Sequence, residues 1–346
     1  MKPFNNRKLN QTKQIASSLV WILGIALLTA LLCAMSLSGE RVAGEEAVDA
    51  DHALEGCFRV LVAAKDRTSG LCDVMMLLSL DRDQNTLSVL QIPRDTYARL
   101  GEGSYRKING APAALGGMPA FRQAMEQTLG ISIDRYVRLS PDAFRKGVDA
   151  LGGVELTLDE PMDYEDPIQG LSIHLKKGTQ LLDGKEAEWF VRYRADYVRG
   201  DLGRLDAQKQ FLAAFVRKAL ALRSPMGLAR LAAAILEDVD TDLGASDLFM
   251  LSEATMELSS EKILFVTAPG EDAVGKNGGS YYVLSAKGME ALLSDHFGKE
   301  QEGFDPQKSF LNANSEAFRR IYESKISYRI YTSREIGESG ISIPRT

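Results

Sequence analysis

Three closely spaced stretches of the chain are almost wholly apolar. They read "CFRVLVAAKD" (57–66), "DVMMLLSLD" (73–81) and "TLSVLQI" (86–92). Each has the length of a strand, and apolar runs without polar alternation are typical of strands that are covered on both faces. The pattern therefore predicts three neighbouring strands inside a layered α/β domain.

Helical and extended patterns alternate further along the chain. The clearest helix has Ser140 as its N-cap and Pro141 in its first turn. The alternation predicts the fold class α/β, with a mixed central β-sheet flanked by helices. Helices are expected over 116–130, 140–153, 183–191 and 201–222, and strands over 133–140, 154–159 and 262–270.

The longest apolar run stands near the start, from Ile15 to Leu37. As a helix it is long enough to cross the roughly 30 Å apolar core of a bilayer. Basic residues precede it and acidic residues follow it, which predicts a cytoplasmic N-terminus and an extracellular remainder. A cleaved signal peptide and a lipoprotein anchored at Cys33 are the alternatives. The run is too long for the first, and Leu32 is too bulky for the second.

The expected organisation is that of a single-pass type II protein of the cell membrane. The segment after residue 298 is polar and is expected to be loosely attached. The predicted parts are a cytoplasmic N-terminus (1–14), a transmembrane helix (15–37), an extracellular linker (38–56), an α/β domain (57–298) and a polar C-terminal tail (299–346).

The charge balance argues against a nucleic-acid-binding protein. The formal net charge is -6, whereas a protein that displaces counterions from phosphate needs a basic surface. Two cysteines, Cys57 and Cys72, would lie outside the membrane, where a disulfide is possible. Two buried thiols are the alternative, because a hairpin would place these cysteines at opposite ends.

Several familiar catalytic sets are missing from the sequence. The three histidines, His52, His174 and His296, are far apart, and no HExxH, nucleophile elbow, CxxC or Lys-Ser/Thr phosphate loop occurs. Nucleophilic hydrolysis by a serine and a histidine-built metal site are therefore poor explanations. The groups that remain as candidates for catalysis are carboxylates, arginines and a hard metal ion.

Polar residues do gather at the ends of predicted elements. Asp66 and Asp73 bracket a loop between two strands, and two carboxylates at one sheet edge are suited to Mg²⁺ with phosphate oxygens. Pro93 ends the third strand and presents Arg94 and Asp95. Ordinary polar turns are the alternative explanation for each cluster. The third cluster is "RKING", with Lys107 and Asn109.

The fourth cluster is "VRYRADYVRGDLGRLDAQ". If the segment from Arg192 to Arg194 is extended, both guanidiniums lie on one face and are spaced to hold two phosphates. In the helix that follows, Asp201, Arg204 and Gln208 share one face. A solvated helix face is the alternative for these three. Together the clusters predict a site for a doubly charged phosphate group with Mg²⁺, and the bilayer suggests a lipid-linked pyrophosphate.

The sequence resembles the LytR-CpsA-Psr family of bacterial cell-wall phosphotransferases. The resemblance runs from about Phe58 to Phe297 through "LQIPRDT", "KING", "LDGKEAEWFVRYR", "GDLGRLDAQKQF" and a late "APG". It implies a ligase that transfers a glycopolymer, such as teichoic acid or capsule, from an undecaprenyl pyrophosphate carrier to peptidoglycan. The cofactor would be Mg²⁺, with Mn²⁺ as a substitute, and pyrophosphatase activity is an expected side reaction.

By position, the resemblance implies a role for each candidate residue. The metal carboxylates would be Asp66 and Asp73, and the phosphate clamp would be Arg94, Arg192 and Arg194. Asp201, Arg204 and Gln208 match further site residues, with Asp201 and Arg204 among the catalytic set. Asp95 would orient or deprotonate the acceptor hydroxyl, and Lys107 and Asn109 would bind substrate.

Two positions depart from the family pattern. Leu71 stands where the family usually has an arginine, and Ala64 stands where it usually has a glycine. Arg67, in the same loop, is the candidate that would replace the missing cation and bind substrate. The departure keeps a second interpretation open, in which the chain is a weak or inactive paralogue that binds polyprenyl phosphate or wall polymer.

Overall fold

The structure is a computed structural model that describes most of the chain after residue 55. The described residues are 56–66, 70–100, 105–166, 171–221, 234–244, 246–247, 250–251, 254, 258–276, 278–298, 310–311 and 316–345. The expected transmembrane helix and Arg67 lie outside them. Among the helices of this described part, none combines the length and the apolar character needed to cross a membrane.

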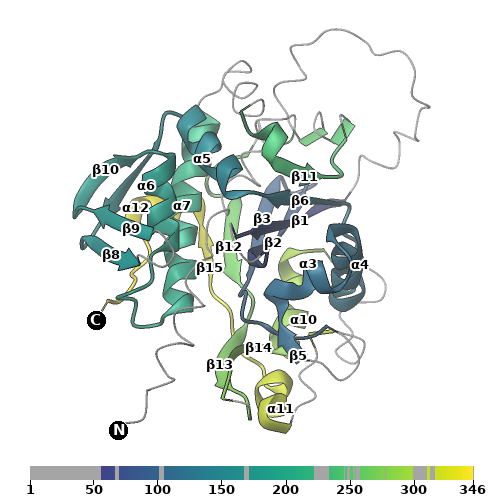
Figure 1. Ribbon diagram of the computed structural model, residues 1–346. Coiled ribbons are helices and arrows are strands. Elements are labelled where there is room, and N and C mark those ends of the chain that lie inside the picture. The colour runs from purple at the N-terminus through teal and green to yellow at the C-terminus, as the bar shows by residue number, and fades with distance from the viewer. Residues whose placement is uncertain are drawn as a thin grey trace, which may run out of the picture.

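A seven-stranded mixed sheet forms the centre of the molecule (Figure 1). The order is β11 (Val239–Thr241), β6 (Arg135–Leu139), β1 (Cys57–Lys65), β2 (Cys72–Asp81), β3 (Thr86–Ile92), β12 (Ile263–Thr267) and β15 (Ile330–Thr332). β2 runs antiparallel to both β1 and β3, while β6 is parallel to β1 and β12 is parallel to β3. Four strands, β1, β3, β6 and β12, therefore end at the same edge.

Helices cover both faces of this sheet. Along β1, Val60 and Val62 belong to one core cluster, and Leu61 and Ala63 belong to the other. This explains why the central strands read as unbroken apolar runs. The first cluster packs under α5 (Pro141–Ala150), α6 (Gly184–Arg192), α7 (Asp201–Ala221) and α12 (Ser333–Ser339), and the second under α3 (Ala111–Ala114), α4 (Met118–Leu129) and α10 (Ala286–His296).

Local signals place several helix ends as the sequence predicts. The Ser140 hydroxyl accepts a hydrogen bond from the Ala143 amide at the start of α5. Gly130 ends α4 with φ 66°, a left-handed conformation that glycine adopts without strain. The predicted fold class, with its mixed sheet and flanking helices, is therefore confirmed.

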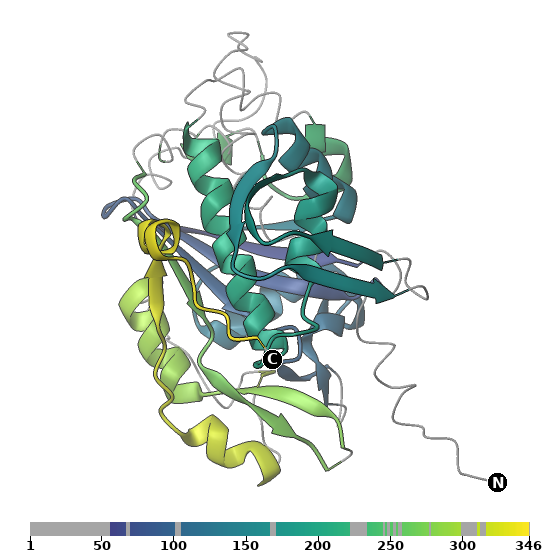
Figure 2. The same ribbon diagram turned by 90° about the vertical axis from the view of Figure 1, so that its left-hand side faces the viewer.

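Four two-stranded sheets lie outside the central sheet (Figure 2). The strand expected at 154–159 forms, but as β7 of one of these small sheets, where buried and exposed side chains alternate. The small sheets are β4 (Tyr97–Arg99) with β5 (Tyr105–Lys107), β7 (Val154–Leu158) with β10 (Gly178–Leu182), β8 (Met162–Asp166) with β9 (Leu171–Leu175), and β13 (Gly270–Val274) with β14 (Ser280–Leu284). Single turns of 3₁₀-helix occur at η2 (Ile108–Gly110) and η3 (Leu236–Asp238).

The C-terminal segment, residues 316–345, is part of the fold, so the prediction of a loosely attached tail is wrong. It contributes α11 (Glu316–Glu323), the edge strand β15, which pairs with β12, and α12. Phe318 packs with Tyr97 and Tyr281, and Ile336 and Ile341 join the core under α7. Scattered apolar anchors thus hold a segment whose average composition is polar.

The two described cysteines are free thiols. Cys57 lies opposite Asp81 and Cys72 lies opposite Lys65, so the β1–β2 hairpin holds them at opposite ends. Of the two alternatives, the structure supports separate thiols.

Candidate active site

The candidate residues converge on the edge of the sheet where β1 and β3 end. Asp66 follows β1 directly, Asp73 is the second residue of β2, and Pro93 ends β3. In open α/β sheets, ligands bind outside the carboxyl ends of the strands. The position of these residues therefore suits a binding site.

Arg94 lies at the centre of this site and is 5% exposed. Its Nη1 atom is 2.9 Å from Asp73 Oδ1, its Nη2 atom is 3.5 Å from Asp201 Oδ1, and its Nε atom is 3.8 Å from Asp95 Oδ1. Burial disfavours the charge, but Asp201, Asp73 and Asp95 outweigh this effect and raise the pKa of Arg94. A permanently charged guanidinium is thus fixed by carboxylates from three separate segments.

The first turn of α7 contributes a second arginine to the same network. Arg204 Nη2 is 2.6 Å from Asp201 Oδ1. Arg204 is fully buried, and burial lowers its pKa to about 10. Burial would raise the pKa of Asp201, yet Arg204, Arg94 and Arg194 lower it. The alternative of a solvated helix face is therefore wrong for this stretch of α7.

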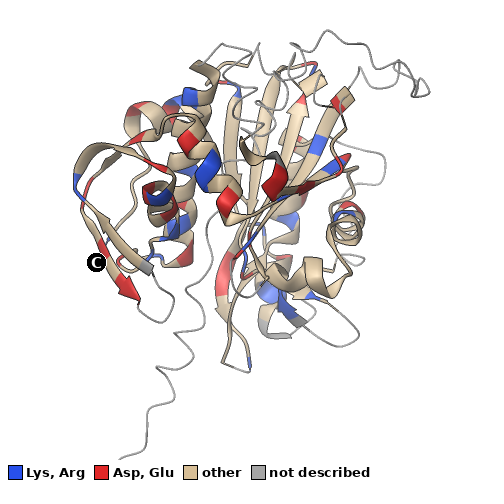
Figure 3. Cartoon of the chain, turned by 45° about the horizontal axis from the view of Figure 1, so that its top comes forward, with Lys and Arg blue, Asp and Glu red and all other residues tan. Residues whose placement is uncertain are grey.

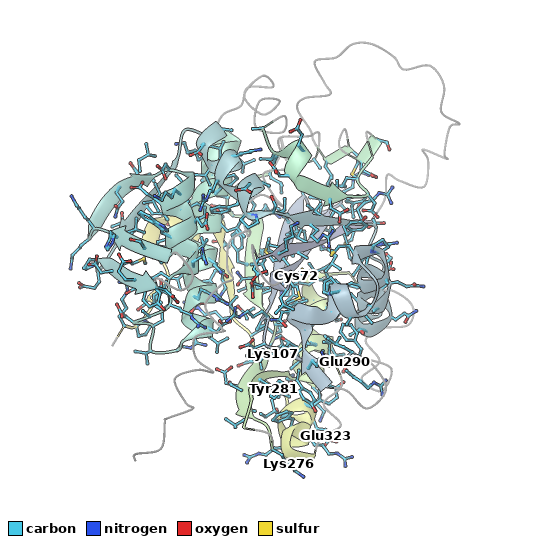
Figure 4. All side chains as sticks on the ribbon, in the orientation of Figure 1. Cys72, Lys107, Lys276, Tyr281, Glu290 and Glu323 are labelled. Atoms are coloured by element: carbon cyan, nitrogen blue, oxygen red, sulfur yellow. The ribbon has the colours of Figure 1, made fainter. Side chains whose placement is uncertain are left out.

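The "RKING" turn folds back onto the Arg94 turn. Lys107 Nζ is 2.9 Å from Asp95 Oδ1, and the backbone amide of Asn109 donates to the Arg94 carbonyl at 3.2 Å. In Figure 4, Lys107 lies just above Tyr281 of β14; Tyr97, the strand partner of Lys107, stacks edge-on against Tyr281 at 5.1 Å. These contacts hold the "RKING" turn beside Arg94, and the role of Lys107 and Asn109 in substrate binding stays a prediction.

Asp66 and Asp73 are both buried, and the charge of Asp66 acts on Asp73. Burial raises the pKa of Asp73 to about 6, with Arg94 and Arg204 opposing the shift. Asp73 Oδ2 is buried and has no hydrogen-bond partner among the described residues, while Asp66 Oδ1 accepts from the Gly70 amide at 2.7 Å. A buried carboxylate oxygen of this kind next to a second carboxylate fits a Mg²⁺ ion, which also binds phosphate oxygens and water. The described residues contain no cluster of three or more His, Cys, Asp or Glu suited to a metal.

Arg192 and Gln208 both contact residues of α6. Arg192 is the last residue of α6, and its Nη1 atom is 3.0 Å from Glu188 Oε1. The predicted extended segment is therefore wrong at Arg192, although Tyr193 is extended. Gln208 donates to the Val191 carbonyl at 3.1 Å. Both contacts secure the end of α6.

Arg194, in contrast, does approach the network. Its pKa is lowered by burial and by the nearby charge of Arg94, and Asp201 and Asp95 partly compensate. Three arginines, Arg94, Arg194 and Arg204, therefore lie close together at one site. In the view of Figure 3, acidic and basic segments are interspersed over the described chain, so this concentration of arginines is local.

Two site features were not expected from the sequence. Asp272 of β13 has its pKa raised by partial burial and by the charges of Asp201 and Asp95, with Arg199 opposing the shift, so it belongs to the same electrostatic environment. Glu188 is buried and pairs with both Arg145 and Arg192. No local pattern marks Asp272, because "GEDAV" reads as an ordinary polar loop.

A statistical model of the LytR_cpsA_psr family matches residues 36–297. The chain belongs to this family. TagV of Bacillus subtilis, a polyisoprenyl-teichoic acid–peptidoglycan teichoic acid transferase, is 31% identical over 237 residues, which are 66% of this chain but 60% of TagV. TagU of Oceanobacillus iheyensis, which has the same activity in its name, is 30% identical over 70% of this chain and 74% of its own length.

Solved structures agree with the LytR_cpsA_psr assignment. The crystal structure of Bacillus subtilis TagV superposes with a TM-score of 0.60 at 28% identity, covering 71% of this chain and 99% of that chain. Protein gbs0355 from Streptococcus agalactiae shares the fold, with a TM-score of 0.62 at 22% identity over 72% of this chain and 90% of its own. The family expected from the sequence motifs is therefore confirmed.

Leu71 lies at the edge of the site and is 37% exposed. It is close to Gly110 at the end of the "RKING" turn, since a Cβ at Gly110 would lie 3.8 Å from Leu71 Cδ2. The rim of the site is thus apolar at this point.

Proposed function

We propose that this chain is a membrane-anchored extracellular phosphotransferase of the LytR_cpsA_psr family. It moves a glycopolymer, such as teichoic acid or capsule, from an undecaprenyl pyrophosphate carrier to peptidoglycan. The observation that carries the proposal is the buried Arg94, held by Asp73, Asp95 and Asp201 where the sheet ends. The names of TagV and TagU as teichoic acid transferases support it.

Arg94, Arg194 and Arg204 bind the pyrophosphate in this proposal. Phosphoryl transfer depends on positioning and on stabilising charge, because charge builds up on the phosphate oxygens. Arg94 Nη2 is 3.5 Å from Asp201 Oδ1, a long ion pair that a phosphate oxygen can replace. Arg204 remains held by Asp201 at 2.6 Å and keeps the helix end in place.

Asp66 and Asp73 would hold Mg²⁺, with Mn²⁺ as a substitute. The metal, when bound, neutralises charge on the pyrophosphate and on the departing prenyl phosphate. Arg94 fixes the orientation of Asp73 through its contact with Oδ1, which leaves Oδ2 for the metal. Water in place of the acceptor hydroxyl would give the pyrophosphatase side reaction.

The proposed location rests on the sequence outside the described residues. The apolar run from Ile15 to Leu37 would anchor the chain, with the basic residues before it in the cytoplasm. The site would then face the carrier lipid and the peptidoglycan. The acidic chain as a whole gives no basis for a nucleic-acid partner.

Reconstitution of the full chain in phospholipid vesicles tests the proposal. The substrate is a prenyl-pyrophosphate-linked glycan, the acceptor is peptidoglycan fragments, and the readout is released prenyl phosphate together with glycan on the acceptor. Transfer should require Mg²⁺, and Arg94→Ala and Asp73→Asn should each reduce it by about 10²-fold or more. The exposed Arg334→Ala variant serves as the control. Transfer that survives both site variants contradicts the assignment.

The exposed Leu71 favours a second candidate, a module that binds polyprenyl phosphate or wall polymer without turnover. A site with one cation fewer binds the developing charge less well. Tight Mg²⁺-dependent binding of the prenyl pyrophosphate by the full chain, with no released product, would support this candidate over the enzyme.

A further inference from the structure

Asp272 lies on β13, and one strand, β14, separates β13 from the turn that carries Arg94 and Asp95. The backbone amide of Tyr282 in β14 donates to the Asp95 carbonyl at 2.9 Å, and Asp272 of β13 is the register partner of Tyr282. Neighbouring strands are about 4.8 Å apart, so the backbones of Asp95 and Asp272 are separated by about 10 Å. Figure 1 shows this hairpin below the sheet edge, next to β5.

The side chain of Asp272 shares one face of β13 with Gly270, because alternate residues of a strand point the same way. A Cβ at Gly270 would lie 2.7 Å from Tyr282 Cε1, so the Tyr282 ring covers that face, and its hydroxyl donates to the Ala268 carbonyl at 2.7 Å. The charges of Asp201 and Asp95 act on the Asp272 carboxylate. It therefore borders the site beside the Arg94 turn.

Among the described residues, Asp272 differs from Asp73, Asp95 and Asp201 in having no ion-pair partner. Asp73 and Asp201 contact Arg94, and Asp95 is 2.9 Å from Lys107 Nζ. Asp272 makes no hydrogen bond or ion pair with any residue that the structure describes, and its side chain is exposed. A carboxylate paired with a cation is a weak base, whereas one surrounded by other carboxylates holds a proton more readily.

We infer that Asp272 is the base that takes the proton from the acceptor hydroxyl. The inference rests on the proposed function. As the acceptor O–H bond breaks, its proton passes to Asp272, and the acceptor oxygen bonds to the phosphorus that carries the glycan. The bond from that phosphorus to the bridging oxygen breaks, and the prenyl phosphate leaves with the electron pair. Asp95, held by Lys107, then positions the turn and does not take the proton.

Two matched substitutions on β13 test the assignment. Asp272→Asn removes the base, and Glu271→Gln makes the same chemical change on the neighbouring, exposed residue of the opposite face. In the vesicle assay, Asp272→Asn should lower the transfer rate by about 10² to 10⁴-fold, the usual contribution of a general base. Its affinity for the prenyl pyrophosphate with Mg²⁺ should stay within twofold, and Glu271→Gln should transfer like the unaltered protein.

Chemical rescue by formate provides a second measurement. Asp272→Ala leaves an exposed gap, so added formate should restore part of the transfer rate in this variant and have no effect on Glu271→Ala. Transfer by Asp272→Asn within threefold of the unaltered protein overturns the assignment, as does a parallel loss of substrate affinity. An unaltered protein that transfers nothing overturns both the proposed function and this inference.

Discussion

Replacing Arg345 with alanine should loosen the loop that carries Arg194. The guanidinium of Arg345 donates to the Glu160 and Pro161 carbonyls at 3.2 and 2.8 Å. It also lies 5.5 Å from the ring centres of both Tyr193 and Tyr197. The end of the chain is thus attached to the loop between α6 and α7, which leads directly into the site.

The size of the effect follows from these contacts. Each hydrogen bond contributes about 1 kcal/mol net, and each cation–π contact at a partly exposed position contributes roughly 0.5 kcal/mol. One guanidinium makes all four contacts and solvent replaces some of them, so the expected loss is about 2 kcal/mol. For a domain of this size, that loss corresponds to a decrease in the melting temperature of about 4 °C.

Differential scanning calorimetry of the full chain measures the loss of stability. Titration with prenyl pyrophosphate measures the weaker binding that a loosened Arg194 loop should cause. Arg345→Lys should recover part of the stability, because an ammonium group donates to carbonyls but lacks the planar stacking group. Arg319→Ala, which breaks an exposed pair with Glu323 on α11, should leave both measurements unchanged. A melting temperature that Arg345→Ala does not change would show that the C-terminal contact contributes no stability. An unchanged affinity would show that the loop does not depend on it.

Three further predictions concern separate parts of the molecule. Leu71→Arg adds a cation to the apolar rim and should tighten binding of the prenyl pyrophosphate about tenfold by calorimetry, and unchanged affinity would contradict this. Glu188→Ala removes the buried partner of Arg192 and should lower the unfolding free energy by about 3 kcal/mol in urea titrations, whereas a loss below 1 kcal/mol would refute it. Burial raises the pKa of Cys72 to about 12, so alkylation mapped by mass spectrometry should modify Cys57 before Cys72. Because both cysteines are free thiols, an added reductant should not change the melting temperature.

The central part of the fold could be predicted from sequence because burial on both faces produces a simple pattern. Strands β1, β2 and β3 are mostly apolar and largely buried, and Ser140 and Gly130 mark helix ends by local chemistry. The partners of strands were harder to predict. The alternation in "VELTL" shows one covered face, but nothing local indicates that β7 pairs with β10 outside the main sheet.

The identity of most site residues could be predicted from the sequence, but their positions relative to one another could not. Arg94, Asp201 and Arg204 stand in recognisable motifs, and the fold brings them together. Arg192 was misplaced because α6 extends one residue further than expected, which turns its side chain back to Glu188 four residues earlier. Asp272 was missed because its environment depends on how a polar hairpin packs beside the Arg94 turn.

The position of β15 has a consequence for how the molecule is made. Its partner β12 reads "ILFVT" and is an apolar strand whose open edge can pair with another chain. Synthesis begins at the N-terminus, so the β12 edge stays unpaired until the chain has extended past β15. A chain truncated after β12 but before β15 would therefore expose an unpaired strand edge and be prone to aggregation. Chains that include β15 cover this edge with a strand of their own, so the segment after β12 protects the molecule from such pairing.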